Sequence, residues 1–221
     1  MYELIHGNCI EVLRQMPDKS IDCIITDMPY GVGFQFGEYA DTEDNLRHLI
    51  IHALPEMRRV ARRVAIMPGI FNLMLYPQPT WLLIYHKHGT FCAWGYNRWN
   101  PILVYGSDPD HRLRVRRPDT IAMNATRADE EIDHPSPKPL WLMRKLINRV
   151  APSPADTILD PFMGSGTTGV AAIQLGHKFI GVELNGDYLA IAKRRIAQAT
   201  PDFQLTLDLK AKDITCSTSP T

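Results

Sequence analysis

The chain has 221 residues, 45% of them hydrophobic, which allows one sizeable core but is short for two independent domains. It contains no apolar run of about 18 residues and no signal-peptide pattern at its N-terminus, so we expect a cytoplasmic protein without a membrane contact. Lysine plus arginine (24) equals aspartate plus glutamate (24), so the net charge gives no indication of a nucleic-acid partner.

The first half of the chain alternates predicted helices and strands. Asn8 and Glu11 have the spacing of a helix-capping pair, and the helix that they begin should end near residue 16. Residues 21–26 (Ile-Asp-Cys-Ile-Ile-Thr) predict a buried strand, and helical apolar spacing follows over residues 46–61. Further strands are predicted at residues 64–67, 81–85 and 102–105.

The second half continues this alternation after a polar, turn-rich stretch at residues 106–118. The expected elements are a helix at 140–150, a strand at 157–160, a helix from about 167, a strand at 179–183 and a helix at 185–199. Strands that alternate with helices predict an α/β fold, with a mostly parallel sheet and helices on both faces. We expect one domain over residues 1–209 and a disordered, Ser/Thr-rich tail at residues 210–221.

Neither a metal site nor a disulfide framework is indicated. The four cysteines are Cys9, Cys23, Cys92 and Cys216. They lie far apart and form no Cys-x-x-Cys pair, so we expect reduced and mostly buried thiols. His86 and His88 have no carboxylate or thiol partner nearby in the sequence, which argues against a metal site there.

Two loops that follow predicted strands carry the candidate chemistry. Ligands of open α/β sheets bind outside the carboxyl ends of the strands, where both Asp27 and Asp160 should lie. Gly164 and Gly166 let the backbone approach a ligand closely, and the next helix offers free N–H groups to an anionic group such as a carboxylate. Glu183 stands where an acidic residue binds ribose hydroxyls in nucleotide-binding units. Together these features predict a ligand that contains adenosine.

The glycine loop also limits which adenosine ligand fits. No Gly-Lys-Ser/Thr follows the glycines, which excludes a phosphate-binding loop, and a complete Gly-x-Gly-x-x-Gly exists only formally through Gly169. S-adenosylmethionine needs a ribose acceptor and a carboxylate site but no phosphate cradle. It therefore suits this loop better than a dinucleotide.

Residues 27–30 (Asp-Met-Pro-Tyr) suit a planar base that carries an amino group. An exocyclic amine is a poor nucleophile because its lone pair is delocalised into the ring, so a catalyst should accept hydrogen bonds from both amino hydrogens. The Asp27 carboxylate can accept one hydrogen and the carbonyl of Met28 or Pro29 the other, while Tyr30 can stack on the base. A plain turn with a core tyrosine is the alternative interpretation.

In combination, these motifs resemble those of the amino DNA methyltransferases, which modify N6 of adenine or N4 of cytosine. Residues 27–30 resemble the catalytic Asp/Asn/Ser-Pro-Pro-Tyr motif, and residues 160–168 (Asp-Pro-Phe-Met-Gly-Ser-Gly-Thr-Thr) resemble the cofactor motif. Residues 179–183 are similar to the segment that follows it. Residues 134–139 (His-Pro-Ser-Pro-Lys-Pro) resemble an element that helps hold the methionine end of the cofactor. The order of the motifs is that of the beta class.

The resemblance implies a methyltransferase fold, S-adenosylmethionine as cofactor and DNA as substrate. The residues that it assigns to catalysis are Asp27, Pro29 and Tyr30. The residues that it assigns to the cofactor are Asn8, Asp27, His134, Lys138, Asp160, Phe162, Gly164, Ser165, Gly166, Thr167 and Glu183. Members of the beta class often dimerise, so a homodimer is a further expectation.

The sequence departs from the family pattern at two positions. Met28 replaces the usual first proline of the catalytic motif, which should loosen the loop but leaves the backbone carbonyls in place. Asn8 stands where the family commonly has an aspartate at the cofactor adenine, and it can still accept a hydrogen bond through an uncharged oxygen. Asn8 as a simple helix cap is the alternative, and both roles are compatible.

The resemblance also implies that the target base leaves the duplex, because an amino group inside it cannot reach the cofactor. Base flipping requires phosphate contacts, for which the candidates are Arg112, Arg114, Arg116 and Arg117. They lie in a locally basic segment, and we expect target recognition around residues 105–133. A solvated loop is the alternative. A second cluster, Arg58, Arg59, Arg62 and Arg63, is interpreted as a solvated helix face.

Asp27 favours N6 of adenine in double-stranded DNA as the target, because members that modify N4 of cytosine usually carry serine at this position. Cytosine N4 is the nearest alternative. A DNA-binding relative with weak catalysis is another, because of the departures at Met28 and Asn8.

Overall fold

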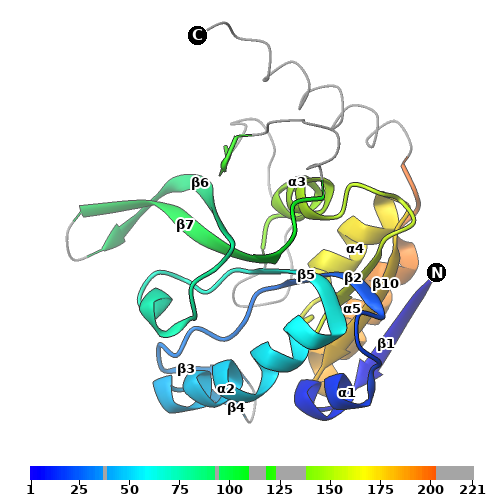
Figure 1. Ribbon diagram of the computed structural model, residues 1–221, viewed down its shortest axis with the longest axis horizontal. Coiled ribbons are helices and arrows are strands. Elements are labelled where there is room, and N and C mark those ends of the chain that lie inside the picture. The colour runs from blue at the N-terminus through cyan, green and yellow to red at the C-terminus, as the bar shows by residue number, and fades with distance from the viewer. Residues whose placement is uncertain (37–38, 93–94, 110–117, 123–137, 203–221) are drawn as a thin grey trace, which may run out of the picture.

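The computed structural model describes residues 1–36, 39–92, 95–109, 118–122 and 138–202. An eight-stranded sheet forms the centre of this part of the chain, in the order β1-β10-β9-β2-β5-β7-β6-β8 (Figure 1). Its strands are β1 (Tyr2–His6), β2 (Ile21–Thr26), β5 (Ala61–Ile66), β6 (Trp81–Cys92), β7 (Gly95–Gly106), β8 (Thr120–Ile121), β9 (Thr157–Asp160) and β10 (Lys178–Glu183). Within this sheet only β7 runs antiparallel to its neighbours, so the predicted mostly parallel sheet is confirmed.

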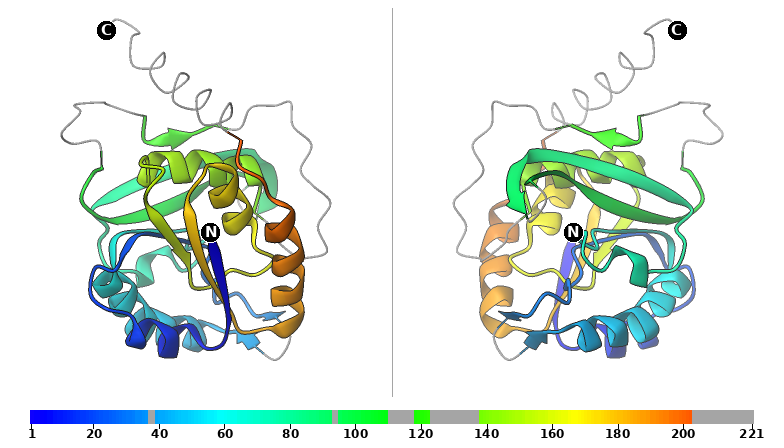
Figure 2. Two further views of the ribbon diagram at one scale, coloured as in Figure 1. Left: turned by 90° about the vertical axis from the view of Figure 1, so that its right-hand side faces the viewer. Right: turned by 90° about the vertical axis from the view of Figure 1, so that its left-hand side faces the viewer.

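Helices cover both faces of the sheet, as predicted. They are α1 (Cys9–Gln15), α2 (Glu43–Val60), α3 (Leu140–Val150), α4 (Thr167–Gln174) and α5 (Gly186–Gln198). One core cluster joins α1 and α2 to the sheet, and a second joins α3, α4 and α5 to the opposite face. Figure 1 shows α1 and α2 below the sheet and α3 above it, and Figure 2 shows α2 (cyan) and α5 (orange) on opposite sides of the molecule.

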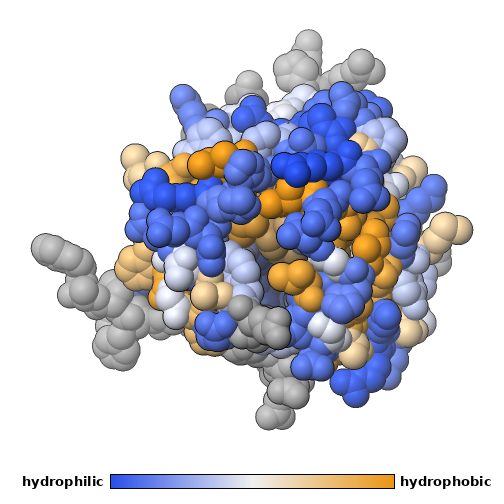
Figure 3. All heavy atoms as spheres, turned by 90° about the horizontal axis from the view of Figure 1, so that it is seen from below, coloured by the Kyte–Doolittle hydropathy of each residue, from blue (hydrophilic) through white to orange (hydrophobic). Residues whose placement is uncertain are grey.

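The outer surface of the α1 and α2 layer is largely hydrophilic, with apolar residues between the polar ones (Figure 3). This pattern is typical of helices that bury one face and leave the other in water. No helix in the described part of the chain is long and apolar enough to cross a membrane.

Strand β2 packs into both clusters. Ile24 lies in the cluster beneath α1 and α2, whereas Cys23 and Ile25 lie in the cluster beneath α3, α4 and α5. All three are fully buried, as expected for a parallel strand that is covered on both faces. Cys9 and Cys23 are buried free thiols, and burial raises the pKa of each to about 12. The expectation of buried reduced thiols is confirmed for these two cysteines.

Some elements of the fold were not predicted from the sequence. Strand β1 was missed, as were β3 (Phe34–Phe36) and β4 (Tyr39–Asp41), which form a separate two-stranded sheet. Strands β6 and β7 have 12 residues each and are much longer than expected. Ile66, the last residue of β5, pairs with Leu103, which in turn pairs with Leu82 near the start of β6. The β6–β7 hairpin therefore projects beyond the carboxyl end of β5 (Figure 1).

The predicted solvated helix face of Arg58, Arg59, Arg62 and Arg63 is correct only for Arg58, which is exposed on α2. Arg58 and Arg59 belong to the last turn of α2, whereas Arg62 and Arg63 lie on β5. The Arg63 guanidinium forms an ion pair with Asp156 at 3.1 Å, and both side chains are largely buried.

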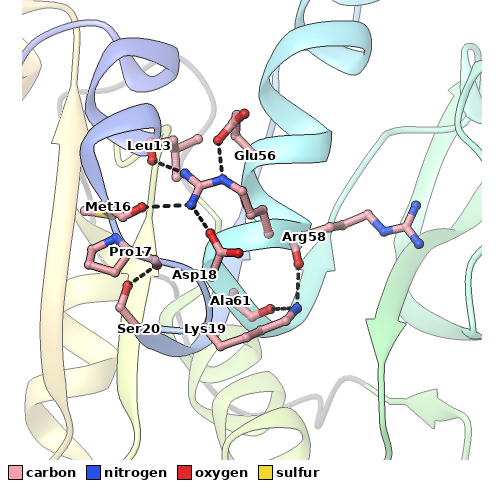
Figure 4. Close-up of polar contacts among 10 residues, drawn as sticks. Leu13, Met16, Pro17, Asp18, Lys19, Ser20, Glu56, Arg58 and Ala61 are labelled. Carbon is pink, nitrogen blue, oxygen red and sulfur yellow. Dashed lines mark hydrogen bonds and ion pairs between the residues drawn. The ribbon is translucent and has the colours of Figure 1, made fainter.

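Arg59 connects α2 to α1, and Figure 4 labels its partners Leu13, Met16, Asp18 and Glu56. Its guanidinium donates to the carbonyl oxygens of Leu13 and Met16, at 2.9 Å each, in the last turn and at the C-cap of α1. It also forms ion pairs with Asp18 at 2.5 Å and Glu56 at 2.7 Å. Carbonyls at the end of a helix have few intrahelical donors, and the Leu13 carbonyl accepts the Met16 amide at 3.1 Å as well as Arg59. Arg59 therefore adds a donor to both carbonyls at the end of α1.

Candidate active site

The two loops that carry the predicted motifs begin at Asp27 and Asp160, at the ends of the neighbouring strands β2 and β9. From β2 the chain passes to β5 on one side, and later returns to β9 on the other side of β2. Ligands of open α/β sheets bind at such a point, outside the carboxyl ends of the strands. Asp27 directly follows β2, and Asp160 is the last residue of β9. The predicted meeting of the two loops at one edge is confirmed by a 2.7 Å hydrogen bond from Thr26 Oγ1 to Asp160 Oδ1.

Asp160 connects elements inside the protein. Its carboxylate also accepts hydrogen bonds from Thr168 Oγ1 at 2.6 Å and from the Phe162 amide at 3.1 Å. The side chain is 2% exposed, and this burial raises the pKa of Asp160 to about 6. These contacts link β2, β9 and the start of α4. A direct contact between Asp160 and the cofactor stays a prediction, but the carboxylate holds residues 160–168, the predicted cofactor loop, in place.

Asp27, Tyr30 and Lys138 form one cluster. The Tyr30 hydroxyl donates to Asp27 Oδ1 at 2.5 Å, and the Lys138 ammonium donates to Asp27 Oδ2. Lys138 Nζ also lies 5.2 Å from the centroid of the Tyr30 ring. The Asp27 side chain is 27% exposed, so it stays accessible to a ligand. Residues more than a hundred positions apart thus hold the predicted catalytic carboxylate in a fixed orientation.

Two residues that the sequence analysis missed hold the backbone of residues 27–32, the predicted catalytic loop. The buried Asp41 carboxylate accepts hydrogen bonds from the amides of Gly31 at 2.6 Å and Val32 at 3.4 Å. The Asn72 side-chain amide donates to the carbonyls of Tyr30 at 2.7 Å and Gly31 at 3.2 Å. Asn72 is a polar residue among apolar neighbours, which was the available signal in the sequence. Its partner Tyr30, however, is 42 positions away.

Met28 does not loosen the loop in the way that its replacement of proline suggested. Its side chain is 1% exposed and packs into the core cluster beneath α1 and α2. Burial of a whole methionine side chain stabilises its position by about 1.5 to 3 kcal/mol. Pro29 and Tyr30 are half-buried. The loop is therefore anchored at Met28, while the next two residues remain near the surface.

The glycine loop has a backbone conformation that only glycine adopts readily. Gly164 and Gly166 have φ angles of +55° and +82°, which strongly favour glycine. Glu183 accepts hydrogen bonds from the Gly164 amide at 2.7 Å and from the Asn185 amide at 2.8 Å, and burial raises its pKa. Gly166 is the N-cap of α4, and no side chain caps this helix. The start of α4 thus suits an anionic group.

Three other predicted cofactor residues have side chains engaged with the protein. The Arg195 guanidinium donates to the Ser165 carbonyl at 2.7 Å, to Ser165 Oγ at 3.4 Å and to Thr167 Oγ1 at 3.1 Å. Ser165 and Thr167 are buried, and the half-buried Phe162 packs against a core cluster. Contacts of these three residues with a cofactor stay predictions. For Ser165 and Thr167 we expect such contacts through backbone atoms, because their side chains are buried.

Asn8 is a helix cap. Its side-chain oxygen accepts a hydrogen bond from the Ile10 amide at 2.9 Å at the start of α1. The preceding Gly7 amide donates to the Glu183 carbonyl at 3.0 Å, so Asn8 begins α1 next to the end of β10. The capping interpretation is confirmed, and a contact with the cofactor adenine stays a prediction.

Several predicted site residues lie outside the described part of the chain. They are His134 and the four proposed phosphate contacts Arg112, Arg114, Arg116 and Arg117. Most of the expected target-recognition segment and the tail at residues 210–221 also lie outside it. These assignments stay predictions.

Comparison with known proteins decides the family. Residues 74–194 match the DNA methylase family of N6 and N4 methyltransferases. The chain belongs to this family. The DNA adenine methyltransferase YhdJ of Escherichia coli (strain K12) is 26% identical over 247 residues, which cover 89% of this chain and 83% of that protein. The putative methylase YubD of the same organism is 28% identical, with 89% and 91% of the two chains covered.

Solved structures share the fold of this DNA methyltransferase. TTHA0409 of Thermus thermophilus, a putative DNA modification methylase solved with S-adenosyl-L-methionine, has a TM-score of 0.63 and 24% identity, with 92% and 96% of the chains covered. The cytosine-N4-specific PvuII DNA methyltransferase has a TM-score of 0.69 and 15% identity, with 97% and 93% covered. The predicted methyltransferase fold is confirmed. The enzyme uses S-adenosylmethionine, as its family does.

Proposed function

We propose that this DNA methyltransferase methylates N6 of adenine in double-stranded DNA, after the base has turned out of the duplex into the crevice beside β2 and β9. The cluster around Asp27 carries this proposal, because it fixes an accessible carboxylate directly after β2, beside the end of β9. Aspartate at this motif position favours adenine over cytosine. The named activity of the relative YhdJ, a DNA adenine methyltransferase, supports the same target.

The chemistry requires an acceptor for each hydrogen of the amino group. A carboxylate oxygen has two acceptor sites, so Asp27 Oδ1 can accept an adenine N–H in addition to the Tyr30 hydroxyl. The carbonyl of Met28 or Pro29 is the second acceptor. These two hydrogen bonds draw the nitrogen toward tetrahedral geometry and make its lone pair available for attack. Tyr30 stacks on the base, and Lys138 and the Tyr30 hydroxyl keep Asp27 in position.

The cofactor residues fit S-adenosylmethionine, which supplies the methyl group as an electrophile. Glu183 stands at the end of β10 with a carboxylate that can accept hydrogen bonds from ribose hydroxyls. Lys138 has three donors and gives one to Asp27, so others are available to a carboxylate of the cofactor. The uncapped start of α4 attracts the same negative charge.

Nucleoside mass spectrometry of DNA after incubation with the enzyme and S-adenosylmethionine tests this proposal. We expect N6-methyladenine, and we expect Asp27→Ala to abolish its formation while calorimetry shows S-adenosylmethionine binding largely retained. Asp44→Ala is the matched control, because it removes an exposed carboxylate from the first turn of α2. If Asp27→Ala methylates DNA near the wild-type rate, the catalytic assignment is wrong.

The same measurement distinguishes the alternatives. N4-methylcytosine in place of N6-methyladenine would assign the enzyme to the other branch of its family. A protein that binds DNA and S-adenosylmethionine but yields neither product would be the DNA-binding relative with weak catalysis.

A further inference from the structure

The segment after β5 lies beside the catalytic loop. Strands β5 and β2 are parallel neighbours, and their last residues, Ile66 and Thr26, pair directly. The amide of Met67, the first residue after β5, donates to the Thr26 carbonyl at 3.0 Å. The chain that leaves β5 therefore starts at the same edge of the sheet as Asp27.

Two contacts fix this segment to the catalytic loop. The Asn72 side chain donates to the carbonyls of Tyr30 and Gly31. Gly69 lies so close to Tyr30 that an added Cβ would be 3.2 Å from Cγ of the ring. The position of the segment relative to the catalytic loop is thus set by direct hydrogen bonding and packing.

The segment is a tight turn with an inner and an outer side. Its amides bond three residues back, from Leu73 to Ile70 at 3.4 Å, from Leu75 to Asn72 at 3.1 Å and from Tyr76 to Leu73 at 3.3 Å. The inner side chains are those of Leu73, Leu75 and Tyr76, which pack against the core. A turn with this spacing brings side chains three positions apart onto one side.

Phe71 and Met74 are three positions apart and occupy the outer side. Phe71 is 83% exposed and Met74 is 91% exposed, whereas the other large hydrophobic residues of the same turn are buried or half-buried. Two large apolar side chains are therefore held in water, in a fixed position beside the catalytic loop. Folding gains nothing from this arrangement, because their apolar surface stays exposed.

We infer that Phe71 and Met74 form a wedge that enters the base stack of double-stranded DNA and fills the space left by the flipped base. This inference rests on the proposed function. Removing a base from the stack costs a few kcal/mol, and phenylalanine and methionine are among the side chains that proteins insert between bases. A second copy of the chain is a weaker candidate occupant, because a stable interface buries about 800 Å² per partner and two side chains supply little of that.

Methylation of two duplexes tests the wedge. Both contain the sequence that wild-type enzyme methylates, but in one the base opposite the target is replaced by an abasic site, so that the target is already unpaired. We expect Phe71→Ala and Met74→Ala, and more strongly the double variant, to lower the rate on the paired duplex by about 10 to 100-fold at subsaturating DNA. On the unpaired target the loss should be under about threefold, because less energy is needed to extract the base.

The control variant is Ile51→Ala, which removes an exposed apolar side chain (63%) from α2 and should change neither rate. Circular dichroism and calorimetric S-adenosylmethionine affinity should match wild type for every variant, which shows that the site is intact. Equal rates of variant and wild type on the paired duplex, or equal losses on both duplexes, would overturn the wedge. A wild-type dimer that the double variant converts to monomer, with equal losses on both duplexes, would assign the surface to a second copy. If the wild type methylates no DNA at all, the proposed function itself has failed.

Discussion

Asp27 and Asp160 have the same side chain and lie at the same edge of the sheet, but their surroundings give them different roles. Asp27 is partly exposed and is held by Tyr30 and Lys138. Asp160 is buried and bonds to Thr26 and Thr168. The exposed carboxylate can meet a substrate, whereas the buried one holds the strands and the cofactor loop together.

The raised pKa of Asp160 makes a prediction about stability. Burial raises the pKa to about 6 from an ordinary 3.8, so the folded state favours the protonated carboxyl. This contribution to stability is complete below the unfolded pKa and is lost as pH rises through 6. Relative to the non-titrating Asp160→Asn variant, the wild-type free energy of unfolding should fall by about 2 kcal/mol between about pH 4.5 and pH 7. Urea denaturation at each pH measures this difference, and a constant difference would contradict the assignment.

At the scale of elements, the close packing of α4 against α5 depends on Gly166. A Cβ there would lie 2.9 Å from Cβ of Ala192, and the φ of +82° disfavours any other residue. Gly176 has almost the same φ, +83°, but nothing within 4 Å of an added Cβ. Comparing alanine substitutions at the two glycines therefore distinguishes the cost of backbone strain from the cost of steric contact.

Gly166→Ala should destabilise the protein more than Gly176→Ala. We expect about 1 kcal/mol for Gly176→Ala from the backbone alone, and a further 1 to 3 kcal/mol, roughly, for Gly166→Ala from the overpacked contact. Denaturant unfolding of the two variants measures the difference. Adding Ala192→Gly to Gly166→Ala should recover part of the loss. Equal destabilisation by the two single variants would show that the contact with α5 relaxes without cost.

Most long elements could be predicted from the sequence because their apolar spacing reflects the core that they face. Helix α3 is one example, since its buried residues recur at helical spacing. Strand β2 is another, since its continuous run of apolar residues is buried on both faces of the sheet. The short β3 and β4 strands were missed because three residues show no period. The extended β6–β7 arm was missed because its outer half lies beyond β5. Among the described residues no further strand pairs with that half, so no sheet neighbour there requires an apolar pattern.

The sequence alone indicates those residues of the candidate site whose residue type, together with the adjoining strand or helix, is enough to suggest a role. Asp27 and the two glycines of the cofactor loop belong to this group. Asp41 and Asn72 could not be predicted, because their roles depend on hydrogen bonds to a loop that only the folded chain brings near. The Arg59 side chain was misinterpreted for the same reason, since its partners on α1 are more than 40 positions away.

At the scale of the whole molecule, the neutral total charge requires that DNA be held by a local concentration of basic residues. Arg58, Arg59 and Arg63 are weak candidates, because Arg59 and Arg63 form ion pairs and Arg58 lies over the ring of Tyr105 at 5.1 Å. We therefore keep the proposal that Arg112, Arg114, Arg116 and Arg117 contact phosphates. Each such contact would release counterions, so affinity would fall with salt concentration.

Replacing Arg114 and Arg116 together with alanine should reduce the slope of log affinity against log salt by about 1.5 to 2, since each phosphate contact in duplex DNA contributes about 0.9. Sequence preference should barely change, because phosphate contacts position a protein without reading bases. The control replaces Arg47 and Arg194, which are exposed on α2 and α5, and removes the same charge without changing the slope. Fluorescence anisotropy of labelled duplex over a range of salt concentrations measures the slopes. A lost sequence preference with an unaltered slope would show that this segment reads base edges. If neither quantity changes, the phosphate contacts lie elsewhere, and exposed Arg98 on the projecting β6–β7 arm is the next residue to replace.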